Sequence, residues 1–144
     1  MEETEAKKQS KFSLIELLMI IMLVGIIFTL TIPYHNDKMR KEKLDEAIKN
    51  IQIIAYEDIA FKNNEETGDY YAFDMGMLNV ENKLETINGD YMFDYSVTDS
   101  TVVATTNSNF GKEGAKIVYY LPDGPWQLGD NKISESVFNE SWLP

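Results

Sequence analysis

The chain is built around an apolar stretch that reads Phe12-Ser-Leu-Ile-Glu16-Leu-Leu-Met-Ile-Ile-Met-Leu-Val-Gly25-Ile-Ile-Phe-Thr-Leu-Thr-Ile-Pro33. Between Leu14 and Ile32 the one charged residue is Glu16. A helix that crosses the hydrocarbon core of a bilayer needs about 20 mostly apolar residues, so the stretch predicts a helix that spans or nearly spans a membrane. A carboxylate inside a bilayer is costly unless it is paired or neutralised, which makes Glu16 a candidate functional residue.

The spacing of landmarks in this stretch resembles the processing and assembly motif of type IV pilins and of the pseudopilins of type II secretion systems. In that family the mature chain begins with Phe, carries Glu at its fifth position, Gly at its fourteenth and Pro at its twenty-second. Counted from Phe12, these positions hold Glu16, Gly25 and Pro33. Ser13 stands where the family usually has Thr.

The resemblance implies that residues 1–11 are a leader peptide, removed by a leader peptidase, and that Phe12 becomes the N-methylated first residue. It also implies that Glu16 pairs with the freed amine of Phe12 in a neighbouring subunit, and opposite charges attract far more strongly in a low dielectric than in water. The family has Gly immediately before the cleavage site, whereas this chain has Lys11. An uncleaved N-terminal anchor, without a free amine at Phe12, is the other possibility.

Gly25 and Pro33 predict a weak point in the helix. Gly costs about 1 kcal/mol relative to Ala inside a helix, and Pro33 leaves the carbonyl of Thr29 without its usual partner. The segment between them is therefore the part expected to kink or unwind, and the resemblance implies that it melts in assembled filaments. The plain alternative is that Gly and Pro are common in membrane helices.

Residues 34–64 are predicted to continue the helix in amphipathic form. Apolar residues recur at steps of four, three, four and four, which makes one apolar stripe: Leu44, Ile48, Ile51, Ala55 and Ile59. Charged residues, Glu46 among them, are expected on the exposed surface. Asn63 and Asn64 are reasonable stop signals.

Residues 65–144 predict a loop followed by a small antiparallel sheet. The loop has apolar residues of its own, so it is expected to pack down as a lid, with a short helix over residues 80–86. From Tyr91 the period changes to two, which predicts a strand over 91–97. A β-rich run predicts a second strand over 101–106, a third is expected over 115–121, and a short fourth strand is expected within 126–138. The sequence Pro122-Asp-Gly-Pro125 is a strong turn. The expected fold is α+β and pilin-like, with the second half of the helix packed on three or four strands.

Composition limits the possible partners. The chain has a net charge of −11 and no Cys. Residues 1–11 are neutral and Glu16 adds one negative charge, so the part after Pro33 carries −10. Nonspecific binding of nucleic acid depends on neutralising phosphates with Lys and Arg, so no nucleic-acid partner is expected.

The residue types needed for catalysis are sparse. His35 is the only His, which leaves no zinc site and no catalytic triad, and no phosphate-binding loop occurs. We therefore expect no enzymatic activity and no cofactor. Four C-terminal residues have oxygen ligands of the kind that calcium prefers, although solvated acidic turns are the favoured interpretation: Asp123, Asp130, Asn131 and Glu135.

The expected function is a structural subunit of a type IV pilus-like filament, assembled through residues 12–33. Its expected partners are identical or homologous pilin subunits, the membrane, the leader peptidase and the assembly machinery. Such a chain resides in the inner membrane as a precursor and then in a cell-surface or periplasmic filament. Two alternatives stay open: a pseudopilin of a type II secretion system, and a single-pass membrane-anchored binding domain that never polymerises.

Overall fold

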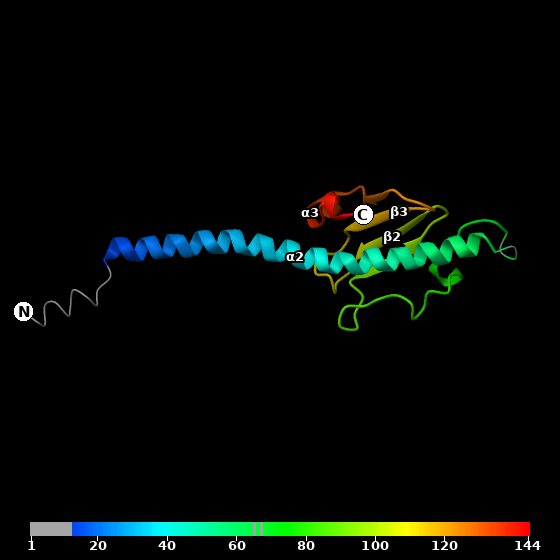
Figure 1. The fold of residues 1–144 in the computed structure, drawn as a ribbon, viewed down its shortest axis with the longest axis horizontal. Helices are drawn as coiled ribbons and strands as arrows, with labels where there is room; N and C mark the ends of the chain where they lie inside the picture. Colours follow the sequence, from blue (N-terminus) through cyan, green and yellow to red (C-terminus); the bar gives the residue numbers. More distant parts are fainter. Residues whose placement is uncertain (1–12, 65, 67) are drawn as a thin grey trace, which may run out of the picture. The chain divides into compact units, whose positions relative to one another are not determined.

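The computed structural model of the chain describes residues 13–64, 66 and 68–144. The chain divides into two compact units, residues 1–38 and 39–144. One α-helix, α2 (Leu14–Lys62), supplies the described helix of the first unit and the first element of the second unit (Figure 1). The predicted continuous helix, ending near residue 63, is confirmed.

In the second unit, one face of α2 is buried in the core. The predicted stripe is confirmed, because Leu44, Ile51 and Ala55 are fully or almost fully buried, and Ala47 and Ile54 beside them are buried as well. Ile48 and Ile59 are only partly buried. The prediction that Glu46 lies on the exposed surface is wrong, because its side chain is 3% exposed and accepts hydrogen bonds from the Met92 amide and the Tyr95 hydroxyl.

Four antiparallel strands form a meander in the order β1-β2-β3-β4. Their bounds are Phe93–Val97, Thr101–Thr106, Lys116–Tyr120 and Trp126–Leu128. The second predicted strand is confirmed at both ends, and the first and third are confirmed with shorter bounds. A row of paired residues crosses the whole sheet: Tyr95, Ala104, Ile117 and Leu128. Ala104 and Ile117, at the centre of this row, are fully buried against the core that α2 completes.

Three phenylalanines hold the C-terminal segment onto the sheet. The ring centroids of Phe93 and Phe110 lie 5.5 Å apart, those of Phe110 and Phe138 5.5 Å, and those of Phe93 and Phe138 6.0 Å. Aromatic pairs at these separations stabilise a core beyond the area that they bury. Phe138 comes from the end of the chain and Phe93 from β1, so the trio joins segments far apart in sequence.

Two short helices follow β4 and were not predicted: α3 (Lys132–Val137) and η2 (Glu140–Trp142). The side chain of Asn131 caps α3 by accepting a hydrogen bond from the Ser134 amide at 2.8 Å. The expected strand within 126–138 is therefore limited to its first three residues. A helix of six residues is too short to show a helical period in the sequence.

The connection between α2 and the sheet is packed down, as predicted, with Ala72, Leu78 and Val80 buried. The predicted helix over residues 80–86 is wrong, because that segment forms turns and bends. The helical turn that the described part of the connection contains is η1 (Met75–Met77). Strand β1 also begins two residues later than predicted. Met92 is buried and Tyr91 exposed, and the Met92 amide donates to Glu46 instead of to a neighbouring strand.

Candidate functional site

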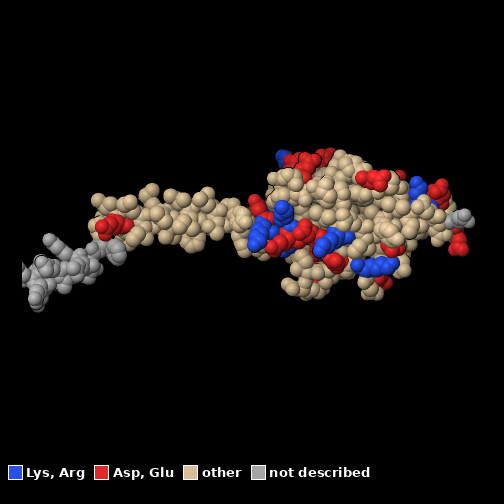
Figure 2. Space-filling view, in the orientation of Figure 1, with Lys and Arg blue, Asp and Glu red and all other residues tan. Residues whose placement is uncertain are grey.

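The first candidate site is the apolar part of α2 in the first unit. Its large apolar side chains from Leu14 to Ile32 are all exposed, between 42% for Val24 and 73% for Leu14. In Figure 2 this part of the helix is almost wholly uncharged, whereas acidic and basic side chains crowd the surface of the second unit. The helix is long and apolar enough to cross a membrane. Such an exposed apolar surface marks contact with lipid or with other protein.

Glu16 lies in the first turn of α2, where it caps the helix together with Ser13. The Ser13 hydroxyl accepts a hydrogen bond from the Glu16 amide at 3.2 Å. The Glu16 carboxylate accepts one from the Ser13 amide at 3.3 Å. This reciprocal pair is a capping box, which satisfies two backbone donors that the start of a helix leaves free. A carboxylate at this end also interacts favourably with the helix dipole.

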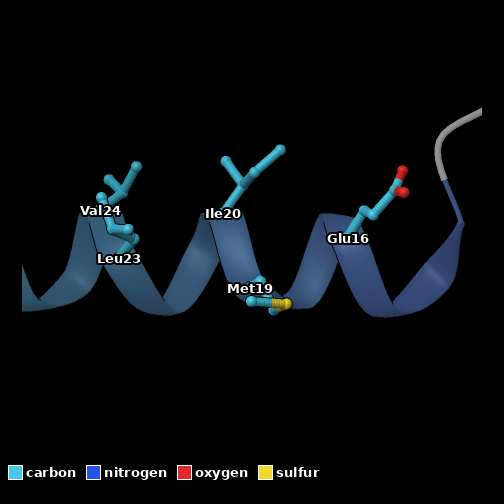
Figure 3. Close-up of a pocket in the computed structure, with 5 residues that line it drawn as sticks. All are labelled: Glu16, Met19, Ile20, Leu23 and Val24. Atoms are coloured by element: carbon cyan, nitrogen blue, oxygen red, sulfur yellow. The ribbon is translucent and has the colours of Figure 1, made fainter.

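The same carboxylate lies at one end of an apolar groove along the helix surface. The groove has a volume of about 420 Å³ and is lined by Glu16, Met19, Ile20, Leu23 and Val24. Glu16, Ile20 and Val24 are spaced four apart and project from one face of the helix (Figure 3). Residues at this spacing face the same neighbour. The groove therefore offers a packing surface for another helix, with one acidic group at its N-terminal end.

Gly25 and Pro33 both lie within the unbroken helix. The Thr29 hydroxyl donates to the Gly25 carbonyl at 2.7 Å, and the Thr31 hydroxyl donates to the Ile27 carbonyl at 2.7 Å. Nothing lies within 4 Å of the position that a Cβ at Gly25 would take. The segment is helical in the single chain, and its melting in an assembled filament stays a prediction.

The other predicted processing residues, Lys11 and Phe12, lie outside the described residues. His35 is exposed on α2. In the C-terminal segment, Asn131 uses its side chain as the cap of α3 and as a donor to the Gly114 carbonyl at 3.2 Å. Within residues 13–64, 66 and 68–144, no group of three or more His, Asp or Glu is placed to hold a metal ion.

The second unit contains a buried polar cluster that the sequence did not predict. Both carboxylate oxygens of Glu46 accept hydrogen bonds from the Met92 amide at 3.2 Å, and the Tyr95 hydroxyl donates to one of them at 3.3 Å. Asn50, fully buried, accepts from the Glu85 amide at 2.6 Å. Its side-chain nitrogen donates to the Glu85 carbonyl and to the Tyr95 hydroxyl, both at 2.9 Å.

Asp58 is a third buried polar residue on the same helix. It is fully buried, and one of its oxygens accepts from the Ala72 amide at 2.7 Å. Its other oxygen has no hydrogen-bond partner among the described residues. Asp58 is four residues beyond Ile54 and seven beyond Ile51, so it continues the buried stripe, and that spacing was the signal available in the sequence.

Comparisons of the chain with protein-family models, with curated proteins and with solved structures find no match.

Proposed function

We propose that this chain is a structural subunit of a type IV pilus-like filament, assembled through its N-terminal hydrophobic helix. The observation that carries the proposal is the apolar half of α2, whose side chains are exposed throughout and whose one carboxylate, Glu16, lies beside a groove. Two further features support it: the spacing of Phe12, Glu16, Gly25 and Pro33, and an α+β unit built on the second half of the helix.

In this function the apolar half of α2 serves two environments in turn. Before assembly it lies in the inner membrane, where lipid covers the exposed side chains. After cleavage of residues 1–11 and N-methylation of Phe12, the helices of many copies cover one another in a filament core. The groove beside Glu16 then receives a neighbouring helix, and the amine of a neighbour's Phe12 supplies the missing positive charge.

Glu16 has a cap partner of its own in the single chain, and this affects how the proposal is tested. Loss of Glu16 removes both a helix cap and a negative charge, so a Glu16→Ala variant cannot separate the two roles. Glu16→Gln keeps an oxygen that can accept from the Ser13 amide and removes the charge. Ser13→Ala removes half of the capping box and keeps the charge.

The experiment compares the native protein with Glu16→Gln, Ser13→Ala and Glu42→Gln, expressed at equal levels. The last is a matched control, because Glu42 is an exposed carboxylate on the same helix. Sheared filaments and membranes are analysed separately, and mass spectrometry gives the N-terminus in each fraction. We expect native protein, Ser13→Ala and Glu42→Gln in filaments, beginning at methylated Phe12, with Glu16→Gln retained in the membrane.

Other results would favour the alternatives. A native protein that begins at Met1 and is absent from sheared filaments fits a single-pass anchor with a binding domain. A protein that begins at Phe12, stays out of surface filaments and is required for protein secretion fits a pseudopilin. Filaments that contain Glu16→Gln in normal amounts would contradict charge pairing as the basis of assembly.

A further inference from the structure

Side chains of α2 supply some of the backbone hydrogen bonds of the segment between α2 and β1. Residues 72–92, called the strap below, contain only the single turn η1 and an isolated bridge between Ile87 and Asp90. Buried backbone groups need partners, and a segment with so little regular structure has to find them elsewhere. Three polar residues of α2 supply such partners at both ends of the strap and in its second half, and other strap groups bond within the strap or to Asn107 and Asn109.

The three attachments follow the helix in order. Asp58 accepts from the Ala72 amide at the start of the strap. Asn50 pairs with both backbone groups of Glu85, and Glu46 accepts from the Met92 amide at its end. Asp58 and Asn50 are fully buried and Glu46 nearly so. Opening the strap therefore breaks all these hydrogen bonds and brings two carboxyl groups into water.

Neither buried carboxyl group, Glu46 or Asp58, forms an ion pair with a Lys, Arg or His among the described residues, which is unusual for a buried acidic residue. The two ion pairs nearby are made by other residues, Lys49 with Glu85 at 3.6 Å and Lys83 with Glu57 at 2.7 Å. Glu46 faces the Tyr95 hydroxyl of β1 and the negative charge of Glu85 in the strap.

Asp58 accepts a hydrogen bond from the Ala72 amide, and no charged group among the described residues contributes to the shift of its pKa. A buried carboxylate without a cation is costly, since burial penalises the charged form.

We propose that the strap is a pH-dependent closure, held to α2 most tightly while Glu46 and Asp58 are protonated and opening more often as they ionise. The closed strap keeps both groups out of water, and the open strap lets each release its proton to solvent. This inference concerns the second unit alone and does not depend on filament assembly.

The direction follows from linkage. Burial raises the pKa of both Glu46 and Asp58 above the ordinary range of a carboxyl group. Hydrogen bonds from Met92 and Tyr95 to Glu46, and from Ala72 to Asp58, act in the opposite sense, and repulsion from Glu85 adds to the rise for Glu46. Opening restores ordinary values, so it releases protons and is favoured by rising pH. Each ionising group can change the opening equilibrium up to about tenfold per pH unit.

The test is amide hydrogen exchange of the full chain in detergent micelles, from about pH 4 to about pH 8. Rates are corrected for the intrinsic effect of pH, so that they report the opening equilibrium. We expect the opening of the Ala72 and Met92 amides to rise with pH more steeply than that of the Val103 and Val118 amides in β2 and β3. Equal slopes for the strap and the sheet would overturn the proposal, whether or not any variant folds.

Variants assign the effect to the two groups. We expect Asp58→Asn to flatten the pH dependence at Ala72 and Glu46→Gln to flatten it at Met92, because each amide side chain keeps the acceptor and cannot ionise. Glu81→Gln is the matched control, since it removes an exposed carboxylate from the strap itself. A pH dependence that persists in both buried variants, or that disappears in Glu81→Gln, would also overturn the proposal.

Discussion

Ser13 and Glu16 form a reciprocal cap at the start of α2, with each side chain bonded to the other residue's amide at 3.2 and 3.3 Å. The residue proposed to act in assembly is thus also a structural part of its own helix. The cap holds the carboxylate near the N-terminal end of the helix, beside the groove that a neighbouring helix would enter.

The capping role of Ser13 can be measured in the single chain. Ser13→Ala removes the acceptor for the Glu16 amide, and loss of an N-cap costs about 1 kcal/mol. We expect faster amide exchange across the first turn, residues 14–17, in detergent micelles. Thr31→Ala is the control, because its hydroxyl bonds within the helix and caps nothing. Unchanged exchange in the first turn of Ser13→Ala would show that the cap contributes little.

Asn50 is expected to be the most sensitive polar residue of the second unit. Asn50→Leu replaces the amide by an apolar side chain of similar size and leaves the Glu85 amide and carbonyl without their partner. Each buried polar group left unsatisfied costs about 1–3 kcal/mol. We expect the free energy of unfolding, measured by urea denaturation, to fall by at least about 2 kcal/mol. Gln52→Leu, an exposed amide two residues away, should change it by less than about 0.5 kcal/mol.

Phe93 lies at the centre of the aromatic trio and is 1% exposed. Phe93→Ala leaves a cavity between β1 and the C-terminal segment, and such truncations cost about 3–5 kcal/mol. The urea midpoint should fall accordingly. Phe73→Ala is the matched control, because the side chain of Phe73 is 66% exposed. Similar losses of stability in the two variants would contradict the proposed core.

Gly129 is needed where β4 ends, because another part of the chain lies too close for a side chain. A Cβ at this position would lie 2.5 Å from the Lys116 Cβ and 3.0 Å from the Ser134 hydroxyl. Gly129→Ala is therefore expected to destabilise the chain by about 1–3 kcal/mol, as overpacking does. At Gly76 the nearest atom would be 3.6 Å away, so Gly76→Ala should be close to neutral. Thermal unfolding of the two variants checks the difference.

The pKa of Glu46 is raised by burial, which predicts how its contribution to global stability varies with pH. A raised pKa in the folded state means that folding binds a proton more tightly, so the contribution is full below the unfolded pKa and is lost as pH rises through the folded one. The difference in unfolding free energy between native protein and Glu46→Gln should therefore shift against the native protein from about pH 4 to about pH 8. A difference in unfolding free energy that is independent of pH would show that burial does not raise the pKa of Glu46.

Patterns along the chain were enough to predict the long helix, its buried stripe and the second strand. Hydropathy over Leu14–Ile32 and the spacing of apolar residues from Leu44 to Ala55 are local properties of the sequence. They indicate a helix without any knowledge of the segments that pack against it. The β-rich composition of Thr101–Thr106 is likewise a local property, and it indicates a strand. Ser13 followed three residues later by Glu16 also matches the pattern of a capping box. Glu16 was predicted to be functional for a different reason, namely its position in the pilin-like motif.

Residues whose environment comes from distant segments were not predicted. Glu46 is a charged residue of the type expected on the exposed face of a helix. Its burial depends on Met92 and Tyr95, which lie more than forty residues later in the chain. Asp58 is buried because the strap crosses it. The fold class and the apolar helix follow from hydrophobic periodicity, which is local. The buried polar cluster follows from which backbone groups of the strap lack partners, and only the packing of strap, helix and sheet determines that.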